Sequence, residues 1–382
     1  MKILQLLSLT MALSAFTLAP VYSAGKENSP TVTVATPRME VVFALDTTGS
    51  MSSMIEGAKR KIWAIANKLK SAQPTPEIRF GLVAYRDRGD DYVTKVFPLG
   101  KNLDEVYEML ASFKADGGGD TPESVNEALA VAVNAIEWSN DPSVLRAIFL
   151  VGDAPPHMDY GNDEKWMVTC RHAKDRGILI NALQCGDDAA TKSVWQEVAH
   201  LTGGAYLSIL QSERTTAIET PYDQDIVSIN RALSDTIIPY GTAEEQTSAN
   251  RHNTLLDLMT PEGIADRTAF LGKDEFGTVI SGKGDLVSDN ISHRTSLDKI
   301  DPKQLSPALA ALPVEERNKI VLQKVEKRRE LLGQLKQLVE KRESEVATKI
   351  KAAEGTDDAI VLSPFEVLSQ QAEDKGYKFN KK

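Results

Sequence analysis

The sequence predicts an α/β fold: a doubly wound, mostly parallel sheet with one antiparallel edge strand, followed by a helical C-terminal region. Short apolar runs without polar interruption recur in the first half of the chain, as expected for strands buried on both faces. Segments with helical spacing of apolar residues alternate with these runs. Past about Ser212 the alternation ends and a long, charged helical pattern follows. Alternating strands and helices imply right-handed crossovers and a sheet covered on both sides.

The elements follow one another in a regular order. The expected strands are 39–45, 77–85, 92–97, 145–151, 178–184 and 205–208. The expected helices are 50–71, 103–115, one that starts at 121–123, 166–176 and 191–201. Strands 77–85 and 92–97 flank a charged turn and should pair as an antiparallel hairpin, which supplies the edge strand. Pro122 is expected at the first helical position of its helix.

The C-terminal region is expected to be mainly helical. Residues 225–238 have a helical pattern, whereas 250–289 show little periodicity, and 313–353 form a long charged helix. Four apolar residues of that helix lie seven positions apart: Val325, Leu332, Val339 and Val346. A coiled coil also needs apolar residues three positions after each of these, but Arg328 and Arg342 stand at two of those positions. This argues against a sustained coiled coil. We expect this helix to pack back on its own chain and the protein to be a monomer.

The N-terminus has the pattern of a secretory signal peptide over residues 1–24. Lys2 precedes an apolar run over 3–19, and small residues provide a cleavage site after Ser23 or Ala24. The alternative is an uncleaved membrane anchor, because the run is near the lower length for a membrane span. We expect a secreted or periplasmic protein that is not an integral membrane protein once the signal is removed. The remaining divisions are a linker at 25–38, the sheet domain at 39–211, an irregular or helical connection at 212–300, the long helical segment at 301–353 and a tail at 354–382.

Composition restricts the partners and the redox chemistry. The chain has 382 residues, with 44 Lys and Arg against 54 Asp and Glu, a formal net charge of −10. An acidic chain lacks the basic face that nucleic acid binding needs, so nucleic acid is excluded as the main partner. Its acidity favours a cationic ligand or simply keeps the protein soluble. Cys170 and Cys185 are expected ~15 Å apart along a helix and a strand, too far to form a disulfide.

Oxygen-bearing side chains cluster where two buried strands end. Asp46 ends the first strand and Asp153 follows the strand 145–151, so both carboxylates should lie at the edge where ligands bind in open α/β sheets. Two carboxylates in a poorly solvated crevice repel each other, and a divalent cation removes that penalty. The hydroxyls of Thr48, Ser50 and Thr121 add neutral oxygen ligands. Oxygen-only ligands favour Mg²⁺, Mn²⁺ or Ca²⁺ over zinc.

These residues resemble a known family. Asp46-x-Thr48-x-Ser50, Thr121 after the glycines 117–119, and Gly152-Asp153 after a buried strand are similar to the three loops of the metal-ion-dependent adhesion site (MIDAS) of von Willebrand factor A (VWA) domains. The resemblance covers about residues 39–210. It is nearest to the variant found in secreted bacterial members and in members linked to α-kinases.

The resemblance implies a role for each residue of the site. It implies that Ser50 and Thr48 bind the metal directly, that Asp46 and Asp153 bind directly or through water, and that Thr121 joins when a ligand is present. Thr48 stands where serine is commoner, which keeps the hydroxyl but adds a methyl group. Ser52-Ser53 stands where the family's adjacent second metal site has an aspartate pair, so we expect no second site.

We expect a binding module, not an enzyme, in which the metal bridges to an Asp or Glu carboxylate of a protein partner. One alternative is a metal-dependent hydrolase, whose general base would be His157, Asp120 or Asp187. Another is a structural protein in which the metal only ties loops together. A third interpretation needs no metal: Ser50 and Thr121 would be helix caps. No nucleotide-binding loop, nucleophile elbow or zinc-protease motif is present in the sequence.

Overall fold

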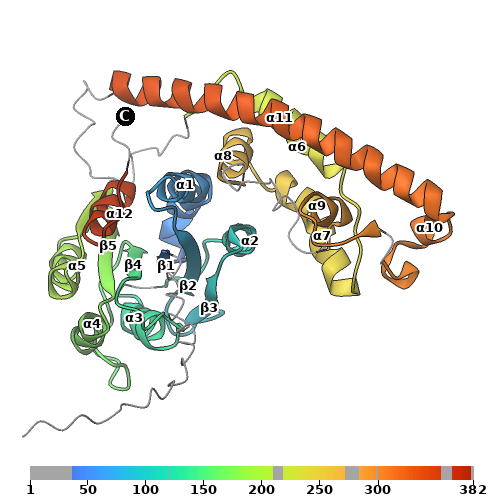
Figure 1. Ribbon diagram of the computed structural model, residues 1–382. Coiled ribbons are helices and arrows are strands. Elements are labelled where there is room, and N and C mark those ends of the chain that lie inside the picture. Colours follow the sequence, from blue (N-terminus) through green and yellow to red (C-terminus); the bar gives the residue numbers. More distant parts are fainter. Residues whose placement is uncertain are drawn as a thin grey trace, which may run out of the picture. The chain divides into compact units, whose positions relative to one another are not determined.

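The structure is a computed structural model that describes residues 37–119, 121–209, 218–271, 284–297, 300–353 and 364–379. It confirms the predicted fold: a sheet that is mostly parallel, with one antiparallel strand, covered by helices on both faces and followed by a helical region (Figure 1). The expectations for residues 1–36, including the signal peptide, lie outside the described part of the chain. Within that part, no helix is long and apolar enough to span a membrane.

Six strands form the sheet in the order β3-β2-β1-β4-β5-β6. They are β1 (Arg38–Asp46), β2 (Glu77–Tyr85), β3 (Thr94–Gly100), β4 (Leu145–Gly152), β5 (Leu179–Cys185) and β6 (Tyr206–Ile209). Strand β3 pairs antiparallel with β2 and all other neighbours are parallel. In the centre, Leu45 of β1 pairs with Val151 of β4. Both central strands therefore end at the same edge of the sheet.

Helices cover each face of the sheet and bury one set of alternating strand residues. One face carries α1 (Ser52–Lys70), α2 (Leu103–Ser112) and α12 (Pro364–Glu373). The other carries α3 (Val125–Asn134), α4 (Trp166–Asp175) and α5 (Ala189–Thr202). Val41 packs into the first layer and its neighbour Val42 into the second, as side chains of a strand alternate between faces. Burial on both faces explains why these strands are continuous apolar runs.

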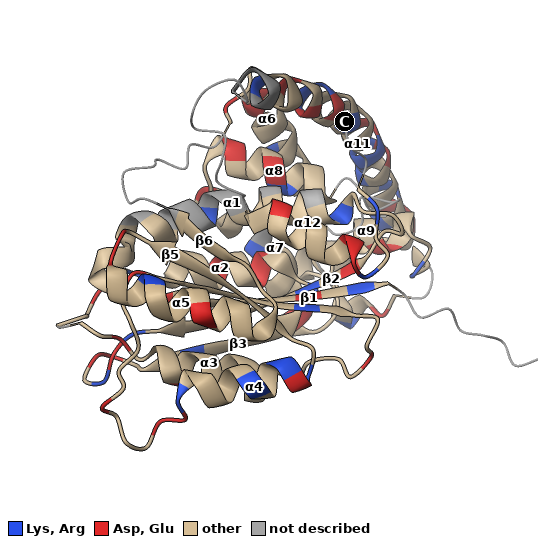
Figure 2. Cartoon of the chain, turned by 90° about the vertical axis from the view of Figure 1, so that its left-hand side faces the viewer, with Lys and Arg blue, Asp and Glu red and all other residues tan. Residues whose placement is uncertain are grey.

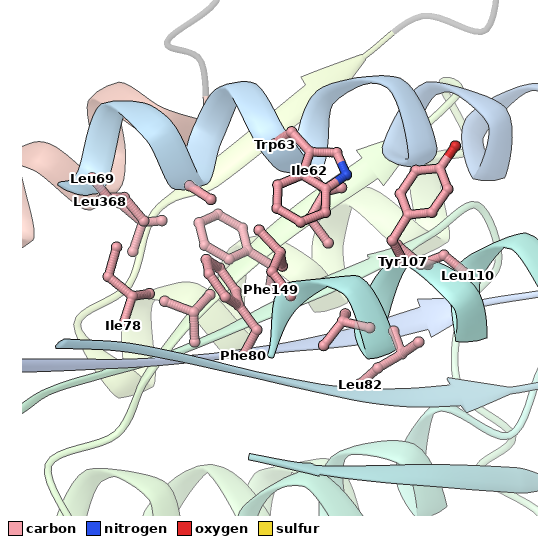
Figure 3. Packing of buried hydrophobic residues seen from close by; sticks show 14 of the residues in the cluster. Ile62, Trp63, Leu69, Ile78, Phe80, Leu82, Tyr107, Leu110, Phe149 and Leu368 are labelled. Atoms are coloured by element: carbon pink, nitrogen blue, oxygen red, sulfur yellow. The ribbon is translucent and has the colours of Figure 1, made fainter. Parts of the chain in front are cut away.

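The core between α1 and the sheet combines residues that are far apart in the sequence. Figure 3 shows Trp63 of α1 above Phe80 of β2 and Phe149 of β4, with Leu368 of α12 closing one end. Trp63, Phe80 and Phe149 are each at most 1% exposed. Burying a large apolar side chain stabilises the fold by about 1.5–3 kcal/mol. The C-terminal helix α12 is therefore part of the hydrophobic core of the sheet domain.

The segment expected to be a tail is tied to the sheet by specific hydrogen bonds. Asn181 is fully buried in β5, and its side-chain amide exchanges hydrogen bonds of 2.7 and 3.1 Å with that of Gln371 in α12. Farther along, Lys378 exchanges backbone hydrogen bonds with Gln73. These contacts join parts of the chain that are 190 or more residues apart, which local sequence patterns do not reveal.

The region between β6 and α12 contains further helices. They are α6 (Asp223–Ser234), α7 (Ala243–Asp257), α8 (Pro261–Leu271), α9 (Leu286–Ile291), a 3-10 turn (Pro302–Gln304), α10 (Pro307–Ala310) and α11 (Val314–Ala353). Helix α8 packs on α1, where the rings of Phe270 and Trp63 lie 5.7 Å apart. Arg267 of α8 also donates two hydrogen bonds of 2.6 Å to Asp104 of α2.

The long helix α11 packs against helices of its own chain. Val321, Val325, Leu331 and Leu335 are buried against other helices of this region. Arg328 pairs with buried Asp285, and Arg342 pairs with Asp223 and Asp266 at 2.6 Å. The two arginines that weakened the coiled-coil interpretation are thus ion-pair partners within the chain. Cys170 and Cys185 are both buried and unpaired, as expected.

Candidate metal site

Three loops meet at the edge of the sheet where β1 and β4 end. The first begins at Asp46, the last residue of β1, and passes through a 3-10 turn at Gly49–Met51. The second precedes α3 and contains Thr121, and the third follows Gly152 at the end of β4. Acidic residues gather on the loops at this edge, at the left of Figure 2. The parallel pairing of β1 with β4 places the first and third loops side by side.

Asp46 is the most deeply buried of the predicted ligands. Its side chain is fully buried, and Oδ1 accepts hydrogen bonds from Thr48 N at 2.9 Å and Thr48 Oγ1 at 2.7 Å. Thr48 Oγ1 lies 3.3 Å from Ser50 Oγ. Asp46 Oδ2 is buried without a hydrogen-bond partner. Three oxygen-bearing side chains of the first loop therefore lie in a row, and the innermost has an unused carboxylate oxygen.

The electrostatics of Asp46 fit a bound cation. Burial raises the pKa of Asp46 to about 7, the hydrogen bonds from Thr48 oppose that rise, and the charge of Asp153 adds to it. A buried ionised carboxylate without a partner costs several kcal/mol. Arg86 lowers the pKa of Asp46, but it donates its hydrogen bonds to the backbone oxygens of Thr47 and Lys114. The residues present therefore fit a divalent cation.

Asp153 follows β4 and is half-buried. Its backbone oxygen accepts a hydrogen bond of 3.3 Å from Thr191 Oγ1. The residue before it, Gly152, packs against Asp46: a Cβ at this position would lie 2.4 Å from Tyr85 Oη and 3.1 Å from Asp46 Oδ2. Real Cβ atoms essentially never come within 3.0 Å of other atoms. Glycine at position 152 therefore allows β4 to end close to Asp46, directly before Asp153.

The loop that contains Thr121 is fixed by its backbone. Gly49 N donates to Gly117 O at 3.3 Å, and Asp116 N donates to Thr47 O at 3.3 Å. These bonds connect the second loop to the first. Thr121 itself is exposed, and Asp120 lies outside the described residues.

The expected helix start at Thr121 is wrong. Helix α3 begins at Val125, and Ser124 occupies its N-cap position. Instead, Glu123 forms a parallel β-bridge with Pro156: Glu123 N donates to Pro155 O at 2.9 Å, and His157 N donates to Glu123 O at 3.0 Å. This bridge holds residues 121–123 out of the helix and connects the second loop to the third. Thr121 is not a helix cap, and Ser50 lies inside the 3-10 turn.

The composition of the site determines which metals suit it. In the described part of the chain, no group of three or more His, Cys, Asp or Glu side chains is arranged to hold a metal. The predicted metal ligands include only two carboxylates, those of Asp46 and Asp153, and the other three are hydroxyls. Such oxygen donors suit Mg²⁺, Mn²⁺ or Ca²⁺, whereas zinc is bound more often by histidine and cysteine.

Sequence reasoning overlooked one acidic residue at this edge. The side chain of Glu123 is 3% exposed, and its Oε2 has no hydrogen-bond partner. Burial raises the pKa of Glu123 to about 9, and the charges of Asp46, Asp87, Asp90 and Asp153 raise it further. Its position two residues after Thr121 was the available signal. The sequence Thr-Pro-Glu predicts a helix start, so Glu123 is not among the predicted ligands.

A second polar cluster lies beside the metal site and orders the third loop. Asp87 accepts hydrogen bonds of 2.8 Å from Ser124 Oγ and from Tyr160 Oη. His157 stacks on Tyr160 with ring centroids 4.0 Å apart, and its Nδ1 lies 2.8 Å from Asp159 Oδ1. His157 is therefore engaged in holding the loop. Of the other bases considered for a hydrolase, Asp187 is exposed.

Comparisons with known proteins agree with this architecture. Residues 40–211 match the family model of the von Willebrand factor A domain. The chain is 28% identical over 122 residues to the α-protein kinase vwkA of Dictyostelium discoideum, an alignment that covers 31% of this chain and 19% of the kinase. It is 32% identical over 121 residues to von Willebrand factor A domain-containing protein 7 of Rattus norvegicus, covering 32% of this chain and 12% of that protein. The match thus spans only a small part of each relative.

Among solved structures, the chain resembles proximal thread matrix protein 1 from the mussel byssus, with a TM-score of 0.36 and 14% identity over 47% of this chain and 43% of that one. A structure of the same mussel protein with a zinc-occupied MIDAS motif gives the same TM-score and identity, over 45% of this chain and 42% of that one. The family match covers residues 40–211, just under half of this chain, and it is the von Willebrand factor A domain to which these residues are similar.

Proposed function

We propose that this protein is a metal-dependent binding module, in which Asp46, Thr48, Ser50, Thr121 and Asp153 hold a divalent cation that bridges to a carboxylate of a protein partner. The observation that carries the proposal is Asp46 Oδ2, a fully buried carboxylate oxygen without a hydrogen-bond partner, at the end of a row of hydroxyls. Mg²⁺ is the expected metal, with Mn²⁺ or Ca²⁺ as substitutes.

The distribution of exposure supports a partner-facing site. Asp46 and Thr48 are buried, whereas Ser50 and Thr121 are exposed. A cation among these residues would be bound from the protein side by Asp46 and Thr48 and would remain accessible beside Ser50 and Thr121. Only two of the five proposed ligands are carboxylates and the other three are neutral hydroxyls, so the direct ligands would not give the site of a 2+ ion a net negative charge that repels an acidic group of a partner.

The third loop supports a protein as the partner. Met158 is 47% exposed on this loop, five residues after Asp153. Its backbone is held in place, because Asn126 Nδ2 donates to His157 O at 2.5 Å and Tyr160 is bonded to Asp87. An exposed apolar side chain on an ordered loop near a metal site is suited to a protein interface, where methionine is enriched.

We further propose that the protein is not an enzyme and acts outside the cytoplasm. The first statement is supported by His157, the histidine nearest the site in sequence, whose ring is engaged with Asp159 and Tyr160. The second is supported by the signal-like sequence of residues 1–24.

Thermal unfolding with and without divalent ions tests the metal site. A ligand that binds only the native state stabilises it by about 2.7 kcal/mol at a hundredfold excess over its Kd, so Mg²⁺ or Mn²⁺ should raise the Tm of the wild type. Asp46→Ala removes a ligand and should abolish the rise. Asp91→Ala, which removes an 85% exposed carboxylate at the same edge, should keep it. A wild type whose Tm ignores both ions would disprove the metal site.

Partner capture then separates binding from a purely structural metal. The full-length protein immobilised with Mg²⁺ should retain its partner and release it in EDTA, whereas Asp46→Ala should retain none. Retention that is equal with Mg²⁺ and EDTA would favour the structural alternative.

A further inference from the structure

We infer that Glu123 is a third carboxylate of the metal site, which accepts hydrogen bonds from the water ligands of the cation and so holds them in place. It is a positioning residue and not a direct ligand. The inference rests on the proposed function and assigns a role to a residue outside the predicted set of ligands.

The side chain of Glu123 lacks a partner although it is buried. It is 3% exposed, and its Oε2 accepts no hydrogen bond. Leaving a buried acceptor unsatisfied costs about 1–3 kcal/mol, and more for a charged group. Other buried carboxylates of this chain are paired: Asp285 binds Arg328, and Asp223 binds Arg342. No described residue forms such an ion pair with Glu123, which leaves its buried carboxyl group open to a cation bound from outside the chain.

The position of Glu123 points to the metal as that group. A Cβ built on Gly118 would lie 3.0 Å from Thr48 Cβ and 3.2 Å from Glu123 Oε1, so both side chains lie against the same glycine. Thr48 Oγ1 in turn donates to Asp46 Oδ1 at 2.7 Å. The orphaned oxygens of Asp46 and Glu123 therefore belong to one site.

Glu123 does not qualify as a direct ligand. Within the described residues, no three carboxylates are arranged to hold one metal, which excludes a direct set of Asp46, Asp153 and Glu123. Hard cations such as Mg²⁺ keep several water ligands, and these waters need acceptors. A carboxylate one water away from the metal provides such an acceptor and orients the shell.

The backbone of Glu123 makes this role testable. Its N–H and C=O are bonded to Pro155 O and His157 N, so the position of the residue does not depend on its side chain. Glu123→Gln keeps the shape of the side chain and removes the charge and one acceptor. The matched control is Glu127→Gln, the same substitution four residues later, inside α3 and at a half-buried position.

Isothermal titration of the full-length variants with MnCl₂ tests the inference, with Tm in EDTA as the check on folding. Glu123→Gln should weaken Mn²⁺ binding 10–100-fold, the usual effect of losing an outer-sphere partner, without a lower Tm in EDTA. Water-proton relaxation by the bound Mn²⁺ should also change, because the water ligands lose an acceptor. Glu127→Gln should bind Mn²⁺ within twofold of the wild type.

The outcomes separate this inference from the proposed function. A wild type that binds no Mn²⁺ would overturn both. A wild type that binds, with Glu123→Gln equal to it within twofold, would overturn the role of Glu123 and leave the metal site standing. If Glu123→Gln does not fold, Glu123→Asp keeps the charge but retracts the carboxylate by one methylene. It should bind Mn²⁺ more weakly than the wild type, and unchanged affinity would overturn the inference.

Discussion

Buried carboxylates occur in two regions of this molecule and are treated differently. In the helical region, Asp285 is fully buried but accepts from Arg328, Ser288 and the backbone amide of Val287. Asp223 is likewise bonded to Arg342 and Thr220. At the edge of the sheet, Asp46 and Glu123 are equally buried, and each has a carboxylate oxygen without a partner.

The two regions differ in how the charge of a buried carboxylate is compensated. A buried charge is tolerated when another charge of the same chain compensates it, which is the arrangement around Arg328 and Arg342. At the edge of the sheet the chain leaves this compensation incomplete and places hydroxyls alongside. There, protonation or a bound cation would have to compensate the buried charge, and the proposed function assigns that role to a divalent cation. In the helical region the arginines already compensate it.

The helical region should be the more sensitive to loss of a charge. Arg328→Met would leave Asp285 buried without its cation, and breaking a buried pair in this way costs about 3–5 kcal/mol. Arg329→Met is the control, because Arg329 is 53% exposed and pairs only with Glu326 on the surface, a contact worth about 0–1 kcal/mol. Urea unfolding of both variants checks this. Equal stability of the two would mean that Asp285 does not depend on Arg328.

The carboxylates at the edge of the sheet should make the free energy of unfolding depend on pH in the absence of metal. The native-state pKa of Asp46 is raised from 3.8 to about 7, so the unfolded chain loses this proton first as pH rises. The stabilising contribution of the protonated form is complete below about pH 3.8 and is lost as pH rises through about 7. Each such group contributes a slope of about 1.4 kcal/mol per pH unit between the two values. The pKa of Glu123 is raised from 4.5 to about 9, so this residue also makes the protein less stable as pH rises.

Urea unfolding in EDTA from pH 5 to pH 8 measures this slope. The wild type should lose stability as pH rises, Asp46→Asn should lose less, and Mg²⁺ should restore stability at the upper end by binding the ionised form. Stability that is flat or rises with pH in EDTA would contradict the unpaired state of these carboxylates.

A smaller effect is expected where a neutral polar pair is buried. Gln371→Ala would leave the amide of Asn181 in β5 with one partner fewer, a loss of about 1–3 kcal/mol. Gln370→Ala, an exposed neighbour on the same helix, should change stability little. Thermal unfolding compares the two. A Gln371→Ala variant as stable as Gln370→Ala would show that α12 is not held by this pair.

The sheet and the position of the site could be predicted because their signals are local. Strands such as β1 and β4 are buried on both faces and therefore stand out as apolar runs, and Asp46 and Asp153 mark their carboxyl ends. Helix α8 gave no such signal, because nearly all of its residues from Gly263 to Leu271 are buried. A helix without an exposed face has no amphipathic period.

Long-range pairing accounts for the rest. Arg328 and Arg342 of α11 stand where a coiled coil would have apolar residues. Their partners Asp223, Asp266 and Asp285 are distant in the sequence, and only the fold places them nearby. Glu123 was misread for a similar reason, since its bridge to Pro156 connects two loops and overrides the local preference of Thr-Pro-Glu to start a helix.

The position of α12 makes the whole helical region an insertion. Residues 218–353 leave the sheet domain after β6, and the chain returns to the same core at Leu368. The sheet domain is therefore a discontinuous domain assembled from two segments of the chain. Helix α8 of this insertion packs on α1 and so belongs to the same core, but a circular permutant with new termini elsewhere in the insertion should still form the sheet. A fragment that ends after β6, by contrast, would leave the core without the helix that closes it.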